Sequence, residues 1–447
     1  MDTRLILSVL WNRRRLRSHE RWSRSELEAF QARQLERLRR FAYARSPFYR
    51  RFHRGLEGKP LGELPILTKT ELMSSFNELV TSPEVRLNDV ERYLETLRSN
   101  DRFRGKFWVS RTSGSTGHPG IFLADRREWA TVIASYARAQ EWAGIHASLT
   151  QRTRLAVVSS RVPWHQSSRV GMSVDSPFIP VHRFDATQPL AEIVAGLNEW
   201  RPENLVAYAS MARVLAEEQL AGRLRISPRA VMCSSEVLTP EGTARIEHAW
   251  GTSPFNVYAA TETAGVASDC RRHRMHLYED LVIPEVVDEQ DRPVPPGTPG
   301  AKILVTVLFS RTQPLIRYAM SDCVSLSTDT CDCGLPFRLL SGIEGRAEDS
   351  LVMHTVAGSD VVIHPNVFHR LLEPLRVQEW QIIQELNLVR ILLSNPKEPV
   401  QEEELVASVT QALRDAGADP PRVQVEIVSA VTRTPLGKAP LIRALRP

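Results

Sequence analysis

Short apolar runs alternate with segments of helical periodicity between residues 125 and 265, and this alternation limits the fold more than any other feature. Polar or turn-forming residues bound each run, as they usually bound buried strands. Parallel strands need a crossover connection, usually a helix, so the pattern predicts βαβ units and a mostly parallel sheet. The runs lie at residues 155–158, 205–208, 230–233 and 255–258.

The segments on either side have a different character. Near the N-terminus, the capping-box pattern Ser23-Arg-Ser-Glu26 starts a helical repeat that should stop before Pro47. Residues 281–326 carry apolar runs separated by prolines and glycines, which predicts antiparallel strands. A compact α+β unit is indicated near the C-terminus by strands at 380–385, 388–393 and 423–428 and a helix over 402–416. The predicted class is α/β: a large N-terminal domain of mostly parallel sheets with helices plus a β subdomain, and a small α+β C-terminal domain.

Residues 110–120 read SRTSGSTGHPG, which combines hydroxyl side chains and glycines in a short span. Such a stretch buries little apolar surface and loses much conformational entropy, so it makes a poor core segment. Apolar residues at 106–109 and 121–123 predict a strand on each side, which indicates a loop fixed at both ends. Backbone N–H groups and hydroxyls in such a loop suit phosphate oxygens. A flexible linker is the alternative, and no Gly-Lys-Ser/Thr ends the stretch as in a Walker loop.

The 447 residues can bury a large core and are enough for two or more domains. With 42% hydrophobic and 24% charged residues, the composition is that of a globular protein. Much of the net charge of +5 comes from arginines between residues 13 and 24, a pattern more typical of a solvated helix face than of a nucleic-acid patch. No apolar run approaches membrane-spanning length, and the first residues lack a signal-peptide cleavage site. We therefore expect a cytoplasmic protein whose five cysteines are thiols or metal ligands.

Further motifs follow the glycine-rich stretch along the chain. NVYAATETAG places Tyr258, Thr261 and Glu262 just after a predicted strand, where the ligands of α/β sheets gather. LIRYAMSD, GRAED and TPLGKAP come later, in that order. In this order and spacing, the motifs resemble those of the adenylate-forming superfamily of acyl-CoA synthetases and adenylation domains, above all its phenylacetate–CoA ligase branch. ARSPFYRRFH and LPILTKTEL near the N-terminus extend the resemblance over nearly the whole chain.

The resemblance implies roles for individual residues. Tyr258 would lie beside the adenine, Thr261 and Glu262 would form a pair in which Glu262 holds Mg²⁺, and Lys438 would be a mobile catalytic lysine. Asp349 matches the hinge about which the small domain swings, which implies domains at 1–345 and 346–447. The implied phosphate loop consists of Thr112, Ser113, Gly114, Ser115, Thr116 and Gly117. The implied adenine-side turn is Ser234, Ser235 and Glu236, and the implied ribose ligands are Asp322 and Arg346.

The chain departs from the family pattern at two positions. Gly120 stands where many relatives carry a lysine after the proline of the loop, and Ser321 replaces the glycine that precedes Asp322. The resemblance still implies an AMP-forming ligase that uses ATP and Mg²⁺. Such an enzyme joins a small oxyacid to AMP, releases pyrophosphate and then transfers the acid to a nucleophile, a CoA thiol or an amine. Because an anion attacks a phosphate, the site must supply positive charge and positioned donors.

The acid and the nucleophile are left open. The resemblance implies pocket walls near Tyr136, at 164–166, around Ser234 and at 259–260, although Trp164 and His165 fit ordinary loop packing equally well. The chain looks most like a clade that includes ATP-dependent diazotases of secondary metabolism, which activate nitrite for attack by an aryl amine. We favour a carboxylate and keep nitrite as the alternative. The expected partners are small molecules, with no nucleic acid and no membrane. The oligomeric state is left open, and a dimer is one possibility.

A non-catalytic, nucleotide-binding regulator is a further alternative. Glu262, Asp322, Arg346 and Lys438 are all present, which disfavours it because a pure binder has no need of a mobile lysine.

The cysteines form a second candidate site. Cys270, His276, Cys331 and Cys333 offer three thiolates and an imidazole, which suit tetrahedral Zn²⁺, and relatives in the resembling branch can carry a structural zinc at matching positions. His273 is the alternative to His276 as the imidazole ligand of this zinc site. Buried apolar cysteines are the alternative. Cys233 and Cys323 are expected to be plain core residues.

Overall fold

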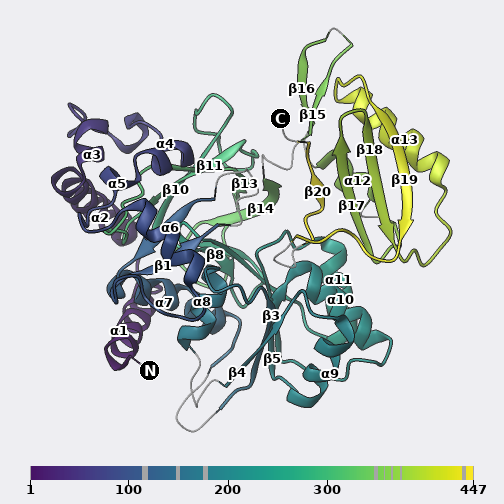
Figure 1. Cartoon of the computed structure of the whole chain (residues 1–447), viewed down its shortest axis with the longest axis horizontal. Helices are drawn as coiled ribbons and strands as arrows, with labels where there is room; N and C mark the ends of the chain where they lie inside the picture. The colour runs from purple at the N-terminus through teal and green to yellow at the C-terminus, as the bar shows by residue number, and fades with distance from the viewer. Residues whose placement is uncertain are drawn as a thin grey trace.

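The structure is a computed structural model that describes residues 2–112, 119–146, 152–174, 180–346, 351–356, 358–363, 366–372, 375–434 and 439–445. Figure 1 shows a large body in purple to green and, beside it at the upper right, a smaller unit in yellow-green built from the C-terminal strands and helices. We call the described residues from 351 onward the C-terminal unit. None of the helices within the described residues combines the length and apolar character that crossing a membrane requires.

The large body is organised around a nine-stranded sheet with the order β13-β14-β9-β8-β7-β6-β5-β3-β4. One half is parallel: β3 (Leu155–Ser159), β4 (Val181–Asp185), β5 (Asn204–Tyr208), β6 (Ala230–Ser234) and β7 (Phe255–Ala260). The other half is antiparallel: β8 (Ala264–Asp269), β9 (Met275–Leu277), β13 (Asp322–Leu326) and β14 (Leu339–Arg346). The parallel strands contain the four apolar runs predicted from the sequence, so the predicted α/β class is confirmed.

Helices cover the parallel half as βαβ crossovers require. Apolar side chains of α9 (Leu190–Trp200), α10 (Ala209–Leu220) and α11 (Pro240–Trp250) pack with β3, β5 and β6 in one core cluster. Residues of α7 (Arg126–Trp142) pack with β6 and β7 in another, and α8 (Gln166–Val174) follows β3. Local signals set these ends: Pro240 occupies the first turn of α11, and Gly251 ends it in the left-handed conformation that glycine favours.

The N-terminal residues form a helical layer on the large body. Its longest members are α1 (Thr3–His19) and α2 (Arg24–Arg45), and α2 begins at the predicted capping box of Ser23 and Glu26 and ends before Pro47. A second capping box, between Thr68 and Glu71, starts α4. The shorter helices are α3 (Pro47–Phe52), η1 (Leu61–Glu63), α4 (Lys69–Ser74), α5 (Phe76–Leu79) and α6 (Leu87–Thr96).

Two small antiparallel sheets complete the large body. The first is a hairpin of β1 (Trp108–Arg111) and β2 (Ile121–Ala124), in which Arg111 lies opposite Ile121. The second contains β10 (Val282–Val287), β11 (Lys302–Val307) and β12 (Tyr318–Met320). Both agree with the strands predicted at 106–109, 121–123 and 281–326.

The C-terminal unit has its own apolar core, drawn from residues between Leu351 and Ile442. A four-stranded sheet has the order β19-β18-β17-β20, and a hairpin of two further strands lies beside it in Figure 1. The helix and strands predicted from the sequence are present to within a residue or two. The elements are β15 (Leu351–His354), β16 (Asp360–Ile363), α12 (Asn366–Leu372), β17 (Glu379–Glu385), β18 (Leu388–Ser394), α13 (Glu402–Asp415), β19 (Arg422–Val428) and β20 (Ile442–Arg443).

Candidate functional site

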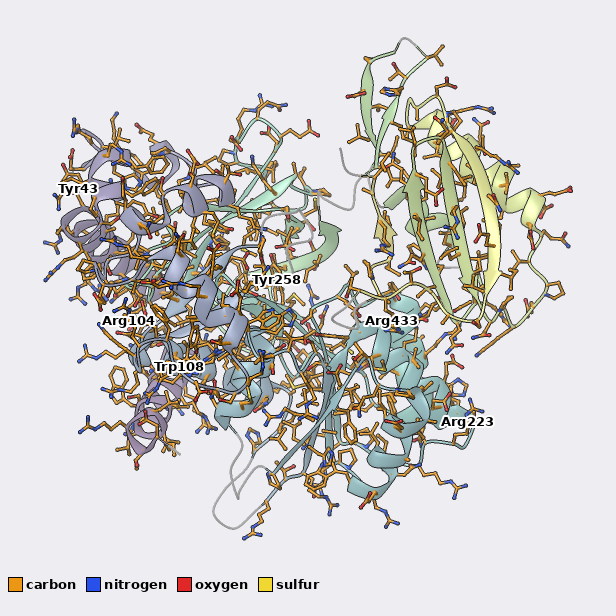
Figure 2. The ribbon with its side chains drawn as sticks, viewed as in Figure 1. Tyr43, Arg104, Trp108, Arg223, Tyr258 and Arg433 are labelled. Carbon is orange, nitrogen blue, oxygen red and sulfur yellow. The ribbon has the colours of Figure 1, made fainter. Side chains whose placement is uncertain are left out.

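A cleft of about 1030 Å³ lies between the large body and the C-terminal unit. Its floor comes from the carboxyl ends of β6 and β7, one wall from β12 and the start of β13, and the opposite wall from Trp380 and residues 439–445. Ligands of open α/β sheets bind outside the carboxyl ends of the strands, so this cleft is the candidate functional site. Figure 2 places Tyr258 near the middle of the molecule, between the two parts.

The cleft brings together residues that are far apart in the sequence. All eight nucleotide-site residues that were predicted from the sequence and whose side chains are described line it: Thr112, Ser234, Ser235, Glu236, Tyr258, Thr261, Glu262 and Asp322. Arg346 lies in β14 opposite Asp322, and its side chain is outside the described structure. Ser113, Gly114, Ser115, Thr116, Gly117, Asp349 and Lys438 also lie outside the described residues. Their roles therefore stay predictions.

Thr261 and Glu262 occupy the turn where the main sheet changes character. β7 is the last parallel strand, and β8 returns antiparallel to it after the turn. The side-chain amide of Gln166 donates a hydrogen bond to the Thr261 carbonyl (3.2 Å), which joins the turn to the start of α8. The turn is therefore fixed by the sheet on one side and by α8 on the other, and it holds a carboxylate at the edge of the cleft.

The two ends of the glycine-rich stretch are tied together. The Thr112 N–H donates to the Gly120 carbonyl (2.9 Å), and the Gly120 N–H donates to the Thr112 hydroxyl (2.8 Å). Both residues continue the β1–β2 hairpin. The stretch is thus a loop fixed at its base, as the flanking strands predicted, and the linker alternative is wrong for its described ends.

Glu236 connects three segments of the chain at the cleft. One carboxylate oxygen accepts the Ser210 N–H at the start of α10, and the other accepts the Ala439 N–H, both at 2.9 Å. Ser235 has a φ of 68°, a left-handed conformation that is uncommon for a residue with a side chain. The turn after β6 is therefore bent so that Glu236 reaches Ala439, which directly follows Lys438 in the sequence.

The predicted acid-pocket residues Tyr136, Trp164, His165 and Gln166 also line the cleft. The Tyr136 hydroxyl donates to the Gln166 side-chain oxygen (3.2 Å), so this amide is held at both ends. Burial raises the pKa of Tyr136 well above its ordinary value, which keeps the phenol neutral and able to donate. The small side chains of Ala259 and Ala260 leave room beside them.

Cys270, His276, Cys331 and Cys333 converge at the antiparallel end of the main sheet, away from the cleft lining. Their ligand atoms all lie within 4.8 Å of one another, with 3.8 Å between the sulfurs of Cys270 and Cys331. Tetrahedral zinc–sulfur bonds of about 2.3 Å would place neighbouring sulfurs about 3.8 Å apart. The Nδ1–H of His276 donates to the Phe337 carbonyl (2.8 Å), which leaves Nε2, 3.2 Å from the Cys333 sulfur, to act as a ligand. The donor set fits Zn²⁺.

His273, the competing imidazole, lies elsewhere. Its Nδ1 is 3.2 Å from the Pro254 carbonyl, and its ring packs against Phe255. Cys233 and Cys323 are buried, as expected of core residues.

Sequence reasoning missed several residues of the cleft. Lys69, Arg213 and the C-terminal wall formed by Trp380, Ile383 and Gln384 all line it. Lys69 belongs to the LPILTKTEL stretch, which carried a resemblance but suggested no role. Arg213 sits within the helix α10 and Trp380 within the strand β17, where ordinary periodic patterns hide any functional signal.

Relatives of known name share much of the chain. A phenylacetate–coenzyme A ligase of Thermus thermophilus is 27% identical over 357 residues, which cover 74% of this chain and 73% of the relative. The phenylacetate–coenzyme A ligase of Escherichia coli is 25% identical over 354 residues, which cover 74% of each chain. No family model matches the chain.

A solved structure shares the fold over almost the full length. It is a 2-hydroxyisobutyryl-CoA ligase in the postadenylation state, in complex with an acyl-AMP, with a TM-score of 0.73 and 21% identity; the match covers 96% of this chain and 91% of the other. An anthranilate CoA ligase in complex with anthranoyl-AMP matches with a TM-score of 0.50 and 17% identity, over 74% of this chain and 64% of the other.

Proposed function

We propose that this chain, an AMP-forming ligase similar to the phenylacetate–coenzyme A ligase branch of the adenylate-forming enzymes, activates a carboxylic acid with ATP and transfers the acyl group to coenzyme A. The observation that supports this most is the cleft itself. Eight residues predicted for nucleotide binding come from four separate segments of the sequence and line one cavity. Carboxylate ligases are also the named relatives, which favours a carboxylate over nitrite.

The reaction has two steps. In the first, a carboxylate oxygen attacks the α-phosphorus of ATP; a carbon–oxygen–phosphorus link forms, the bond to the β-phosphate oxygen breaks, and pyrophosphate leaves. In the second, the thiol sulfur of coenzyme A attacks the acyl carbon, loses its proton, and AMP leaves. The first step brings two anions together, so the protein must supply positioned donors and positive charge more than a base.

Residues of the described structure suit these requirements. Tyr258 and the turn of Ser234 to Glu236 form one side of the cleft, where adenine would bind, and Asp322 offers a carboxylate for ribose hydroxyls. Glu262 offers the hard oxygen ligand that Mg²⁺ prefers, at the turn between β7 and β8. When bound with ATP, that ion neutralises phosphate charge. The acid would lie against Tyr136 and Gln166, which hold each other in place.

We further propose that Cys270, His276, Cys331 and Cys333 hold a structural Zn²⁺, because the four ligand atoms leave no position open for a substrate. Purified protein should contain close to one equivalent of zinc, and Cys333→Ser should lose the ion together with folding stability. Cys323→Ala, at a buried cysteine outside the group, should keep it. Metal-free wild-type protein with an unchanged melting temperature would contradict the zinc assignment.

Product analysis tests the function. The protein would be incubated with ATP, Mg²⁺ and a panel of aryl and short-chain carboxylic acids, with and without coenzyme A, and mass spectrometry would identify acyl-AMP and acyl-CoA. A parallel panel would replace the acid with nitrite and the thiol with aryl amines. Acyl-AMP that becomes acyl-CoA is the expected result. Diazo or triazene products from nitrite would instead identify a diazotase.

ATP–pyrophosphate exchange distinguishes catalysis from regulation. ATP binding without exchange for any acid of either panel would favour the nucleotide-binding regulator. Glu262→Gln is the matched variant, because it keeps the shape of the side chain and removes the charge. It should lower exchange by orders of magnitude and leave the melting temperature unchanged.

A further inference from the structure

The glycine-rich loop contains no lysine or arginine between Thr112 and Gly120. A triphosphate carries several negative charges, and backbone N–H groups supply only partial positive charge. A protein that binds ATP at this loop therefore needs a cation from another part of the chain. Lys69, Arg111, Arg213 and Arg443 are the lysines and arginines among the described lining of the cleft.

Two of these cations lie at the base of the loop: Arg111, which ends β1 directly before Thr112, and Lys69, which begins α4. A Cβ atom built on Gly120 would lie 3.5 Å from the Cε atom of Lys69, the atom that carries the ammonium group. Arg213 approaches Glu379 on the far wall, at 3.4 Å. Arg443 lies on β20 in the C-terminal unit. Lys69 thus brings a positive charge next to the base of the loop from a position 51 residues before Gly120 in the sequence.

Gly120 is needed for this arrangement. The same added Cβ would meet the Phe122 ring at 2.8 Å, closer than real Cβ contacts come. Phe122 is buried and packs edge-on against Tyr318, so its ring has little room to move. A side chain at position 120 would therefore have to displace the buried Phe122 ring, so position 120 is a poor place for a cation of the loop itself.

The backbone around Lys69 is fixed by the strand that forms the other wall of the cleft. The Leu67 N–H donates to the Arg317 carbonyl (3.0 Å), and the Ala319 N–H donates to the Leu67 carbonyl (2.9 Å). Leu67 thereby pairs with Tyr318 of β12, and Leu67 itself is fully buried. The capping box between Thr68 and Glu71 then sets the first turn of α4, which Lys69 begins. Lys69 therefore starts from a rigid base.

We propose that Lys69 binds the β- and γ-phosphates of ATP, and hence the pyrophosphate product, in place of a cation within the loop. The inference rests on the proposed function, since it names the partner of the triphosphate at the same cleft. The ammonium lies beside the base of the loop, whereas Tyr258 and Asp322 belong to the nucleoside side of the cleft. AMP, which lacks both terminal phosphates, should be bound without help from Lys69.

Calorimetric titrations of ATP, pyrophosphate and AMP into the full chain with Mg²⁺ test this assignment. Lys69→Gln should weaken the binding of ATP and pyrophosphate by about 10- to 100-fold, the usual loss for a hydrogen bond between charged groups, and leave AMP affinity unchanged. Lys69→Arg should restore most of the affinity because it keeps the charge. Lys106→Gln, at an exposed lysine paired with Glu84 outside the cleft, is the matched control and should behave as wild type.

Three results would overturn the proposal. Equal weakening of ATP and AMP by Lys69→Gln would mean that Lys69 only supports the fold of the cleft. Unchanged binding of ATP and pyrophosphate would mean that the loop needs no cation from α4. If the wild-type protein bound neither ATP nor pyrophosphate, the proposed function itself would be wrong, and this inference would lose its basis. Melting temperatures check that the variants fold, and Lys69→Met, which also removes the charge, replaces Lys69→Gln if that variant is unstable.

Discussion

Ion pairs hold both the N-terminal helix and the C-terminal unit to the middle of the molecule, but the two contacts differ in kind. His19, Arg138 and Asp280 form what we call the N-terminal anchor. Two Asp280 oxygens accept hydrogen bonds from Arg138 at 2.8 and 2.7 Å, and His19 Nδ1 lies 2.7 Å from the same carboxylate. All three side chains are almost completely buried. This arrangement joins α1, α7 and the turn before β10.

Arg213, Glu379 and Arg433 form what we call the C-terminal contact. Arg213 of α10 lies 3.4 Å from Glu379 of β17, and Arg433 lies 3.0 Å from the same carboxylate. Figure 2 shows Arg433 where the C-terminal unit approaches the helices of the large body. Two neighbouring contacts are more open: the Arg245 guanidinium donates to the Val377 carbonyl (2.9 Å), and Lys397 pairs with Glu217 at 3.0 Å.

The pKa shifts of the two contacts have opposite signs. In the N-terminal anchor, burial alone would raise the pKa of Asp280, but the charge and hydrogen bonds of Arg138 and His19 outweigh it and hold the pKa far below its ordinary value. In the C-terminal contact, burial prevails: it raises the pKa of Glu379 and lowers that of Arg213, despite their mutual attraction. Attraction exceeds desolvation in the first contact, and desolvation exceeds attraction in the second.

The difference suits a fixed element and a movable one. Separating the anchor would expose charges that are better off paired, whereas separating the C-terminal contact would return Arg213 and Glu379 to water and relieve their desolvation. The resemblance implies a C-terminal unit that approaches the cleft for one step and withdraws for the next, and such a unit needs a contact that it can leave at low cost. The following predictions test this comparison.

The largest expected effect on stability is at the anchor. Asp280→Asn leaves buried Arg138 with only the longer ion pair to Glu20, at 3.7 Å, and should lower the free energy of unfolding by about 3–5 kcal/mol. Denaturant titration would measure it. Glu63→Gln, at an exposed carboxylate paired with Lys59, is the control and should leave the midpoint unchanged. Equal midpoints for the two variants would remove the distinction between the anchor and ordinary surface pairs.

Lys438→Ala tests whether the C-terminal unit changes position between steps. Removing a charge that acts only in the adenylation transition state should lower kcat for acyl-AMP formation by about 10²- to 10³-fold, with little change in ATP affinity. Chemically prepared acyl-AMP should still react with coenzyme A at the wild-type rate, because the implied domain movement withdraws the lysine before this step. If both half-reactions slow equally, Lys438 has a structural role and the C-terminal unit need not move.

Glu236→Gln should produce a smaller effect of the same kind. The amide keeps one acceptor oxygen and cannot accept both the Ser210 and the Ala439 N–H, so the hydrogen-bonded link from α10 through residue 236 to the segment after Lys438 is broken at one of its two ends. A lost hydrogen bond to a charged group corresponds to about 1.5–3 kcal/mol, or roughly 10- to 100-fold in the adenylation rate. Single-turnover kinetics of each half-reaction would measure it. If thioester formation slows as much as adenylation, Glu236 does not act only in the arrangement in which it contacts Ala439 during the first step.

Glu379→Gln should cost much less than Asp280→Asn, although both carboxylates are buried. Neutralising Glu379 removes a charge that burial disfavours, and Arg213 can return to water when the contact opens, so we expect a change of about 1 kcal/mol or less in unfolding free energy. The same denaturant titrations would compare the two variants. A loss of 3 kcal/mol or more would show that the C-terminal contact is held as tightly as the anchor.

The pH dependence should be the smallest effect and should run in opposite directions at the two contacts. Asp280 has a lowered pKa, so its stabilisation is present above the pKa of an unfolded aspartate, about 3.9, and is lost as the pH falls. Glu379 has a raised pKa, so its contribution to the C-terminal contact is present below about 4.3 and is lost as the pH rises through the raised value. Fluorescence transfer between labels on α11 and α13 should report a looser C-terminal unit as the pH rises from 4 to 7. A C-terminal unit that is held more tightly at pH 7 than at pH 4 would contradict the expected direction of this pH dependence.

Local patterns predicted most of the fold correctly. The four apolar runs became β3, β5, β6 and β7, and the capping box at Ser23 starts α2, because these features depend on residues near one another in sequence. The joining of β8, β9, β14 and β13 to the same sheet was not predicted, since it depends on pairings such as Leu339 with His276, which no short-range periodicity reveals.

The same distinction applies to the candidate site. Tyr258, Thr261 and Glu262 were identified because a strand end followed by polar residues is a local signal, and the Cys-x-Cys of 331–333 is another. Lys69 was missed because its relevance depends on pairing between Leu67 and Tyr318, about 250 residues apart, and on the absence of a side chain at Gly120. The roles of the loop residues and of Lys438 remain predictions, since they lie outside the described residues.

The N-terminal anchor also has a consequence for biosynthesis. His19 and Asp280 are 261 positions apart, so α1 is synthesised long before the anchor can form. At about 5–20 residues per second, synthesis takes roughly 13–50 s to reach Asp280. Leu5 packs with Trp108 and Trp129, so α1 can bury it as soon as α7 has been made, whereas Leu7, Leu10 and Trp11 stay exposed. Docking of α1 can thus proceed in two stages, first on α7 and then, once Asp280 has been made, through the N-terminal anchor.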